Sequence, residues 1–441
     1  MPNLEQYIDK KQWNKLQQWY LDHDIFEIVD ELYRLEPTDL AVAFRLLPKD
    51  IALAVFENMD PPSQGELISS LRDTQVIELI EKMEPDDRVR LLDELPAKVA
   101  KEMLEGLSSE ERGLTSILLG YPEETVGRVM SPEFVALREF MTAAQALEKV
   151  RKSGREAETI YLLPVTDEYL ILVGVISLRD LVLAKPDAVI NDIMIKNVYS
   201  ARVDEDQEKA ARLVQEADLI ALPVIDMEGR LVGMLTVDDA MEILEYEYTE
   251  DIALGGASRP LERPYLSASV RLLARTRALW LMVLILAATL SVNVLNYFEH
   301  TLEAVVTLAL FIPLLIDTGG NVGSQSATLI VRALAVDEVR FRDFFKVTFR
   351  ELRVGSLLGV MLAIVAIFPV SIFFGFNIAM VLSLSLVTIC VISAVAGAVL
   401  PLIAKRVGVD PAVVSAPIIT TLVDSTGLII YFLIANAILG L

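Results

Sequence analysis

Five polar residues that could contact a cation recur in an apolar stretch that begins near Leu302. They are separated by four, four, three and four residues, so one stripe of a helix would carry them all: Asp317, Asn321, Gln325, Thr328 and Arg332. Polar groups on a membrane helix are tolerable only against water or protein, which makes them candidates for an ion pathway. Gly319 and Gly323 also form a Gly-x-x-x-Gly pattern, which is typical of close helix packing. Taken alone, this stripe leaves both interpretations open.

The last apolar stretch carries a second set of polar and small residues: Thr420, Thr421, Asp424, Ser425, Gly427 and Tyr431. Asp424 is about midway along it. A carboxylate at the centre of a bilayer costs about 2.5–3.5 kcal/mol on insertion scales, so it should face water or a partner. The arginines near the membrane lie only at the predicted helix ends. These facts favour a cation or proton site over a structural salt bridge.

The charge of the chain is unevenly distributed. The 441 residues have a net charge of −23, but residues 261–441 carry +2 and residues 1–260 carry −25. A strongly acidic region attracts cations and disfavours nucleic acid.

Cys390 is the single cysteine, and His23 and His300 are the two histidines, so neither an intrachain disulfide nor a zinc site built from cysteine and histidine is expected. Metal chemistry here must use oxygen ligands.

The N-terminal region, residues 1–128, is predicted to be an acidic helical repeat. Pro37, Pro61 and Pro85 follow one another at 24-residue intervals, each with an acidic or hydroxyl residue nearby. Proline in the first turn and Asp or Ser near it favour helix starts. The pattern predicts stacked helical hairpins, and a solvated face is the simpler interpretation of most of the acidic residues.

Residues 129–236 contain a second repeat, with units at about 130–186 and 194–248. Met130 and Met194 head the units, and Val173-Gly174 matches Val232-Gly233. Each unit predicts a strand, a helix, two apolar strands and a closing helix begun by Asp180 or Asp239. The order of elements resembles a pair of CBS domains, a regulatory α/β module that often binds adenine nucleotides.

That resemblance implies nucleotide contacts from Arg179 and Asp180, although helix capping and surface exposure explain them equally simply. Leu162 and Leu219 stand where an adenine-stacking aromatic residue is expected, which weakens the case for ATP. A long acidic helix at residues 237–260 then leads to the membrane region at 261–441.

Five segments of the membrane region are long enough to span a bilayer: residues 278–298, 302–332, 352–374, 378–403 and 412–439. Lys and Arg gather in the connections at 332–353 and 403–411 and are absent from those at 298–302 and 374–378. The positive-inside rule then predicts a cytoplasmic N-terminus and an outside C-terminus in a cell membrane. The first residues lack the apolar core of a signal peptide.

The whole order of regions, with the motif from Asp317 to Ala335 and the sequence around Asp424, resembles the MgtE family of magnesium channels. The fold implied is multidomain: an all-α helical-repeat N-terminal domain, an α/β CBS-pair domain and an all-α membrane domain with five transmembrane helices. The resemblance implies a homodimer with a pore on its axis, lined by the second and fifth membrane helices. The implied pore residues are Asp424, Thr420, Asn321, Ser324 and Thr328.

The resemblance also implies cytosolic Mg²⁺ ligands that close the pore when internal Mg²⁺ is abundant. These map to Asp86 in the first domain, to Asp206, Glu208 and Asp218 in the CBS region, to Asp239, Glu247, Glu250 and Asp251 in the acidic helix, and to Asp410 in the last cytoplasmic loop. Such sites can gate the pore only by binding the closed state better than the open one.

Other interpretations remain open from the sequence. The chain has Ser324 and Ala416 where some family members have Asn, so selectivity among Mg²⁺, Mn²⁺, Co²⁺ and Ca²⁺ is not determined. A carrier coupled to Na⁺ or H⁺ is also compatible with Asp317 and Asp424. A nucleotide sensor anchored by helices would not need polar stripes in the membrane. No enzyme signature is present, so no catalytic activity is expected.

Overall fold

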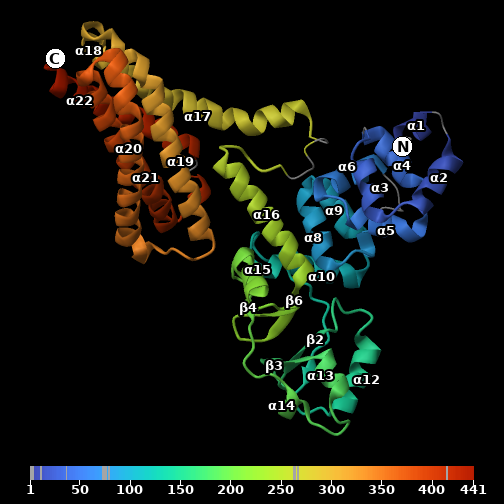
Figure 1. Ribbon diagram of the computed structural model, residues 1–441. Coiled ribbons are helices and arrows are strands. Elements are labelled where there is room, and N and C mark those ends of the chain that lie inside the picture. The colour runs from blue at the N-terminus through green and yellow to red at the C-terminus, as the bar shows by residue number, and fades with distance from the viewer. Residues whose placement is uncertain are drawn as a thin grey trace. The chain divides into compact units, whose positions relative to one another are not determined.

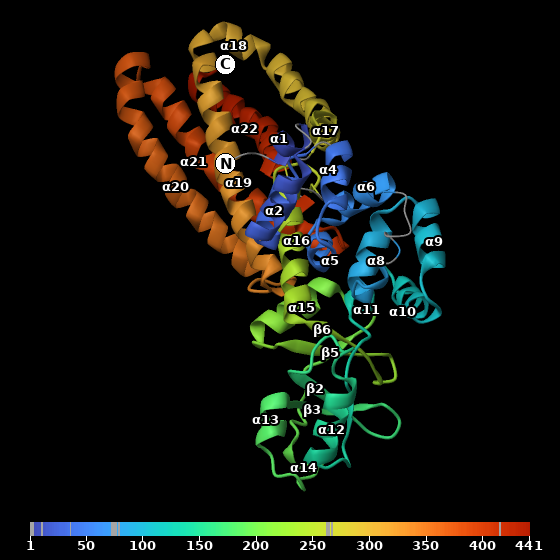
Figure 2. The same cartoon turned by 90° about the vertical axis from the view of Figure 1, so that its right-hand side faces the viewer.

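The computed structural model describes residues 4–9, 12–35, 37–71, 77, 80–261, 265, 268–413 and 416–441. The chain forms two compact units (Figures 1 and 2). The first contains Met1–Glu247 and Leu261–Ala268, and the second contains Tyr248–Pro260 and Ser269–Leu441. The first unit combines helices with two small sheets, whereas the second is helical in its described part.

The first unit begins with short helices around one apolar core. They are α1 (Leu4–Asp9), α2 (Trp13–Asp22), α3 (Ile25–Leu32), α4 (Pro37–Arg45), α5 (Lys49–Glu57), α6 (Pro61–Leu71), α8 (Pro85–Glu94), α9 (Ala97–Gly106), α10 (Ser109–Leu119) and α11 (Val126–Val129). The core includes Tyr20, Phe56 and Leu91, all fully buried. The predicted helix starts are confirmed, because α4, α6 and α8 begin at Pro37, Pro61 and Pro85.

The Arg88 side chain holds the start of α8 in place. It is fully buried, and its guanidinium donates to the carbonyl oxygens of Ile80 (2.9 Å) and Met83 (2.6 Å) and to the Thr115 hydroxyl (2.8 Å). It also forms an ion pair with Glu111 of α10 at 2.8 Å. A planar guanidinium satisfies several acceptors at once, which a lysine cannot do. Arg88 therefore ties the turn before α8 to α10.

We expect Arg88→Met to lower the free energy of unfolding of the helical region by about 3 kcal/mol or more, because it leaves buried carbonyl oxygens without donors. Two of the three tryptophans, Trp13 and Trp19, pack against this core, so tryptophan fluorescence of the full-length protein in urea reports its unfolding. The control is Arg112→Met on the exposed side of α10, with an expected change within about 0.5 kcal/mol. Equal midpoints for the two variants would contradict the assignment.

The rest of the first unit consists of two matching three-stranded sheets. The first contains β1 (Leu137–Arg138), β2 (Leu162–Thr166) and β3 (Leu172–Ser177), and the second contains β4 (Ala201–Arg202), β5 (Ala221–Ile225) and β6 (Leu231–Thr236). In each sheet the first pair is parallel and the second antiparallel, with a register shift after Val165 and after Val224. The predicted internal repeat is confirmed. The accompanying helices are α12 (Ala143–Ser153), α13 (Leu178–Leu183), α14 (Ile190–Ile193), α15 (Gln207–Glu216) and α16 (Val237–Gly255).

The two repeats exchange their leading segments. Ser131 of the first repeat pairs with Met234 in β6, and Ile195 of the second pairs with Val175 in β3. A Cβ on Gly233 would lie 2.5 Å from the Met130 sulfur, and one on Gly174 would lie 2.5 Å from the Met194 sulfur. Such contacts are too close for a side chain, so both glycines are required where the exchanged methionines cross the strands.

The closing helices begin slightly earlier than the sequence suggested. α13 and α16 start at Leu178 and Val237, so Asp180 and Asp239 occupy the third helical position instead of the first. There they accept hydrogen bonds from the hydroxyls of Ser177 (2.7 Å) and Thr236 (2.5 Å). Serine and threonine before the helix are better caps than an acid within it, which explains the shift.

The described part of the second unit contains five helices that are long and apolar enough to cross a membrane. Its elements are α17 (Val270–Tyr297), α18 (Glu299–Ala304), the 3-10 helix η1 (Val306–Phe311), α19 (Ile312–Ala335), η2 (Phe341–Asp343), α20 (Phe344–Phe374), α21 (Phe376–Val407), η3 (Pro411–Val413) and α22 (Ala416–Leu439). The prediction of five spans is confirmed. The second span is not one α-helix from residue 302, because Pro313 lacks an N–H and sits in the first turn of α19. α21 packs against α19, α20 and α22.

Candidate cation sites

One face of α19 is built for close contact with neighbouring helices. A Cβ on Gly319 would lie 2.8 Å from side-chain carbons of Ile389 in α21 and Val423 in α22, and one on Gly323 would lie 2.9 Å from Ile419. Only glycine permits this approach at both positions. The packing interpretation of the Gly-x-x-x-Gly pattern is therefore correct for these residues.

The opposite face of α19 carries the predicted polar stripe. Its members are exposed in the single chain, as the helical spacing required: Asp317, Asn321, Gln325, Thr328 and Arg332. Ser324, one turn along from Gly320, is half-buried. Amide, hydroxyl and carboxyl groups facing lipid would be costly, so this face must meet water or another protein surface.

Thr420 and Asp424 of α22 lie beside Gly320 of α19. A Cβ on Gly320 would be 3.0 Å from the Thr420 methyl carbon and 3.9 Å from Asp424 Oδ1. Asp424 Oδ1 is buried and has no hydrogen-bond partner in the part of the chain that the structure describes. The hydroxyls of Thr420 and Thr421 both donate to the Pro417 carbonyl, at 2.9 and 2.8 Å. A buried carboxylate oxygen without a donor is a strong acceptor for a cation or its water.

Two contacts of α19 were not predicted from the sequence. The Ser326 hydroxyl donates to Glu351 of α20 at 2.7 Å, and the Arg332 guanidinium lies over the Tyr248 ring of α16, 5.6 Å from its centroid. Nothing in the spacing of Glu351 or Tyr248 marks these partners. The contacts show that α19 is held by charged or polar groups on both α20 and the end of α16.

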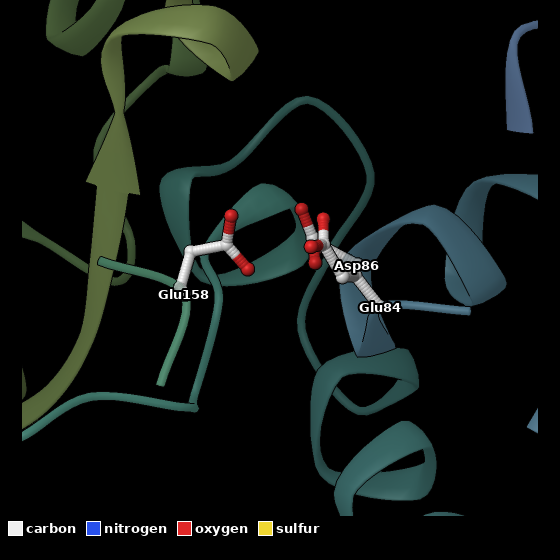
Figure 3. Close-up of side chains that lie close together, drawn as sticks. All are labelled: Glu84, Asp86 and Glu158. Atoms are coloured by element: carbon white, nitrogen blue, oxygen red, sulfur yellow. The ribbon is translucent and has the colours of Figure 1, made fainter. Parts of the chain in front are cut away.

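A second candidate site lies in the first unit, where three carboxylates converge (Figure 3). Glu84 and Asp86 come from the start of α8, and Glu158 comes from the loop between α12 and β2. One oxygen from each lies within 4.8 Å of the others. Asp86 was predicted from the sequence, whereas Glu84 and Glu158 were missed, because both stand in acidic surroundings that suggest only a solvated surface.

Burial and the charges of nearby carboxylates raise the pKa of each carboxyl in this cluster. Burial is the main cause of the raised pKa of Glu84, about 8, and of Glu158, about 7. The pKa of Asp86 is raised well above its ordinary value, by burial first and then by the charges of Asp239 and Asp87. Two unit charges 4.8 Å apart repel by about 3.5 kcal/mol at an effective dielectric constant of about 20. The cluster therefore needs protons or a cation to be stable.

Asp239, at the start of α16, interacts electrostatically with the carboxylates of this cluster. Burial raises the pKa of Asp239 to about 6, and its charge raises the pKa values of Asp86 and Glu158. Arg90 of α8 forms ion pairs with Glu242 and, at 3.7 Å, with Asp87. Arg90, Asp239 and Glu242 line a cavity of about 290 Å³ between α6, α8 and α16. The predicted residues Asp86 and Asp239 are therefore close enough for the charge of Asp239 to raise the pKa of Asp86.

The predicted CBS carboxylates do not meet within one chain. Asp206 caps the start of α15 by accepting from the Lys209 N–H, whereas Asp218 follows the other end with a φ of 52°. Ten helical residues separate them, a distance of about 15 Å. Glu208 forms an ion pair with Arg212 at 2.5 Å. A single ion could join Asp206 and Asp218 only if they came from two chains.

The remaining predicted residues lie on separate elements. Glu247 accepts from the Gln207 side-chain amide at 3.1 Å, and Glu250 and Asp251 follow on the last turns of α16. Asp410 is exposed and accepts from the Ala412 N–H at 2.8 Å. Arg179 is exposed, and its neighbour Asp180 is held by Ser177, which supports the capping interpretation of Asp180.

The raised carboxyl pKa values predict a definite pH dependence without divalent cations. Glu57, Glu84 and Glu158 have ordinary pKa values of 4.5 and folded values of about 7, 8 and 7. The folded state holds these protons more tightly, so the contribution of these three groups to stability is fully present below about pH 4.5 and is lost as the pH rises to about 8. In EDTA, we expect the full-length protein to melt at a higher temperature at pH 5.5 than at pH 8.

Added Mg²⁺ should raise the melting temperature more at pH 8 than at pH 5.5, because protons and cations compete for the same oxygens. Differential scanning fluorimetry in detergent measures both effects. A melting temperature independent of pH in EDTA would show that these carboxyls do not carry the repulsion inferred from their positions.

Comparison with known proteins identifies relatives that cover most of the chain. Residues 312–434 match the MgtE divalent cation transporter family, residues 23–124 match the MgtE intracellular N domain, and residues 126–187 and 190–246 each match the CBS domain. The chain is 40% identical over 406 residues to the magnesium transporter MgtE of Thermus thermophilus, covering 90% of this chain and 89% of that one. It is 32% identical over 434 residues to the magnesium transporter MgtE of Bacillus subtilis, covering 94% of both.

Among solved structures, a crystal structure of the cytosolic domain of the Mg²⁺ channel MgtE in complex with ATP is similar. It has a TM-score of 0.51 and 33% sequence identity, and the match covers 55% of this chain and 98% of that one. Apolar helices long enough to span a membrane, paired CBS domains and these matches define a membrane transporter with a soluble part that contains a CBS pair. The chain belongs to the MgtE family of divalent cation transporters.

Proposed function

We propose that this chain imports Mg²⁺ across the cell membrane through a pore formed by two copies, and that cytosolic Mg²⁺ closes it. The observation that carries the proposal is the buried Asp424 Oδ1 beside Gly320 of α19, which has no hydrogen-bond partner among the described residues. Two copies would bring two such carboxylates to one axis, and their combined charge of −2 would balance the +2 charge of one Mg²⁺. Because Mg²⁺ loses its water reluctantly, the ion would pass between the two carboxylates in hydrated form, with its water donating hydrogen bonds to them.

The exposed polar stripe of α19 supports the dimer. Asn321 and Thr328 are exposed in the single chain and Ser324 is half-buried, so a second copy facing them would enclose a wet path. Asp206 and Asp218 lie at opposite ends of α15, so in this proposal an ion that bound both would have to join two chains. In this proposal Thr420 contributes its main-chain carbonyl to the pore.

The proposed division of the chain is an N-terminal domain at 1–128, a CBS pair at 129–236, a connecting helix at 237–260 and a membrane domain at 261–441. The soluble parts face the cytoplasm and the C-terminus lies outside. The Lys and Arg residues of the 332–353 and 403–411 connections support this orientation, because basic connections remain on the cytoplasmic side.

In this proposal, closure follows from the many carboxylates of the soluble part. Without Mg²⁺, these carboxylates repel one another, and the N-terminal domain, the CBS pair and the connecting helix move apart. Bound Mg²⁺ bridges the carboxylates and draws these parts together. The proposed regulatory ligands are Asp86, Asp206, Glu208, Asp218, Asp239, Glu247, Glu250, Asp251 and Asp410. Several sites acting together give a steep response, since each ion favours the compact state.

An adenine nucleotide at the CBS pair is a further part of the proposal. A relative's cytosolic domain has been solved with ATP, and Arg179 of this chain is exposed at the start of α13, where it can contact phosphate. Asp180 is engaged with Ser177 and would have to leave it to contact a ribose.

Asp424→Ala should abolish Mg²⁺ uptake, because the pore then lacks the charge that draws the ion in. Uptake is measured in liposomes that contain a Mg²⁺-sensitive dye. Thr426→Val is the matched control, since Thr426 is on the same helix and bonds only its own backbone at Leu422. We expect the control to retain flux and Asp424→Ala to lose it by at least tenfold while remaining folded. Equal flux in both would refute the pore assignment.

Neutralising three acids of α16 together should keep the pore open at high internal Mg²⁺. The variant is Asp239→Asn with Glu247→Gln and Glu250→Gln, and we expect the internal Mg²⁺ needed for half-closure in patch recordings to rise by about tenfold or more. The control removes the same charge from exposed positions, Glu205→Gln with Glu216→Gln and Glu228→Gln. If both triple variants close at the wild-type concentration, the regulatory assignment is wrong.

A further inference from the structure

The first part of α20 has two different faces, and its inner face packs against α19 and α21. Val347 belongs to an apolar cluster with residues of both helices, and Glu351 accepts a hydrogen bond from the Ser326 hydroxyl at 2.7 Å. Gly355 continues this face, since a Cβ there would lie 2.7 Å from the Cys390 carbonyl oxygen. These positions are four residues apart, so they form one side of the helix.

The outer face of the same part of α20 carries a basic stripe. It consists of four residues, all exposed in the single chain, at intervals of four, four and three: Arg342, Lys346, Arg350 and Arg353. Arg342 is in η2, directly before α20. At 3.6 residues per turn, the other three lie within an arc of about 60° on the side away from Glu351.

The basic stripe has no acidic partner in the part of the chain that the structure describes. Neighbouring basic residues do have one: Asp337 pairs with Arg340 at 3.3 Å and with Lys405 at 3.8 Å. No residue of the stripe forms an ion pair with a described residue, although Arg353 lies over the Phe349 ring, 5.0 Å from its centroid. The stripe is therefore a surface to which an anion can bind.

The length of α20 places the basic stripe at the edge of the bilayer. The helix has 31 residues and is about 46 Å long, whereas the hydrocarbon core is about 30 Å thick. Residues 354–374 contain no charged side chain and extend over about 31 Å, so they fill the core and leave Arg353 at its boundary. The stripe then lies at the level of the lipid headgroups.

The surface below the basic stripe identifies the partner as lipid. The same side of α20 continues with exposed apolar side chains at intervals of four and three residues from Arg353: Leu357, Met361, Ile364 and Phe368. Phe345, 84% exposed, adds an aromatic ring beside the cations. Cations at the level of the headgroups above a continuous apolar face match a molecule with an anionic head and acyl chains.

We propose that the basic stripe binds the headgroups of anionic phospholipids, whose acyl chains lie along the apolar side of α20. The guanidinium groups of Arg350 and Arg353 donate pairs of hydrogen bonds to phosphate oxygens, and Arg342 and Lys346 add attraction over a longer range. Because the inner face of this segment holds α19 and α21, bound lipid stabilises the packing of these helices. The inference requires that α20 spans a membrane, and it does not depend on which ion is transported.

The test compares two lipids that differ in headgroup charge. Full-length protein in detergent is titrated with dioleoylphosphatidylglycerol, which is anionic, or with dioleoylphosphatidylcholine, which has the same chains and no net charge. Native mass spectrometry counts the bound lipids. We expect the wild type to bind phosphatidylglycerol about tenfold or more tightly than phosphatidylcholine, and the variant Arg342→Gln with Lys346→Gln and Arg350→Gln to bind both about equally.

Two further variants separate headgroup binding from a general effect of charge or folding. Arg112→Gln with Lys152→Gln and Lys185→Gln removes the same charge from exposed positions of the first unit and should keep the preference for phosphatidylglycerol. Arg342→Lys with Arg350→Lys preserves the charge of the stripe and should keep it too.

Three results would overturn the proposal. The first is a wild type without the preference, which would leave the stripe to an acidic protein surface. The second is an equal preference in the wild type and the stripe variant, or an equal loss in the variant of the first unit. The third is displacement of phosphatidylglycerol by inorganic phosphate at the same concentration, which would show a site for a free anion.

Discussion

The structure depends on carboxylates that are buried without basic partners. Asp86 and Glu158 in the first unit, and Asp424 in the second, each have a buried oxygen without a hydrogen bond in the described part of the chain. Burying a charge in this way is unfavourable unless something supplies the opposite charge. In the proposed function, the divalent cation that is transported and that regulates the pore supplies this opposite charge.

Other features of the fold hold these carboxylates in position. Arg88 uses its whole guanidinium inside the helical region, so it orders the start of α8 without neutralising Asp86. Arg90, by contrast, balances part of the acidic field through Glu242. In the second unit Gly319, Gly320 and Gly323 let α19 approach α21 and α22 closely enough to bring Asp424 against the backbone. Packing thus keeps the carboxylates of Asp86 and Asp424 in place, where they are not neutralised by a basic side chain of the described part of the chain.

The exchange of segments between the CBS repeats has a related consequence. Met130 crosses Gly233 in the second repeat and Met194 crosses Gly174 in the first, so neither repeat can move without disturbing the other. α16 continues directly from β6, and its end contacts α19 through Tyr248 and Arg332.

The sequence by itself determined which regions form helices and which form small sheets, and that the polar residues of α19 lie on one side of that helix. Helical periodicity, the 24-residue proline spacing, the paired Val-Gly motifs and five apolar segments depend on local geometry, and the structure confirms each. Asp424 was predicted as a cation site from its place in the last apolar stretch, whereas Asp86 and Asp239 were predicted only through the family resemblance. Only the tertiary structure decided that Glu84 and Glu158 meet, that Arg88 turns inward, and that Asp206 and Asp218 lie apart within one chain. The reason is physical: periodicity specifies which face of an element a residue occupies, whereas the partner on that face is chosen by long-range packing.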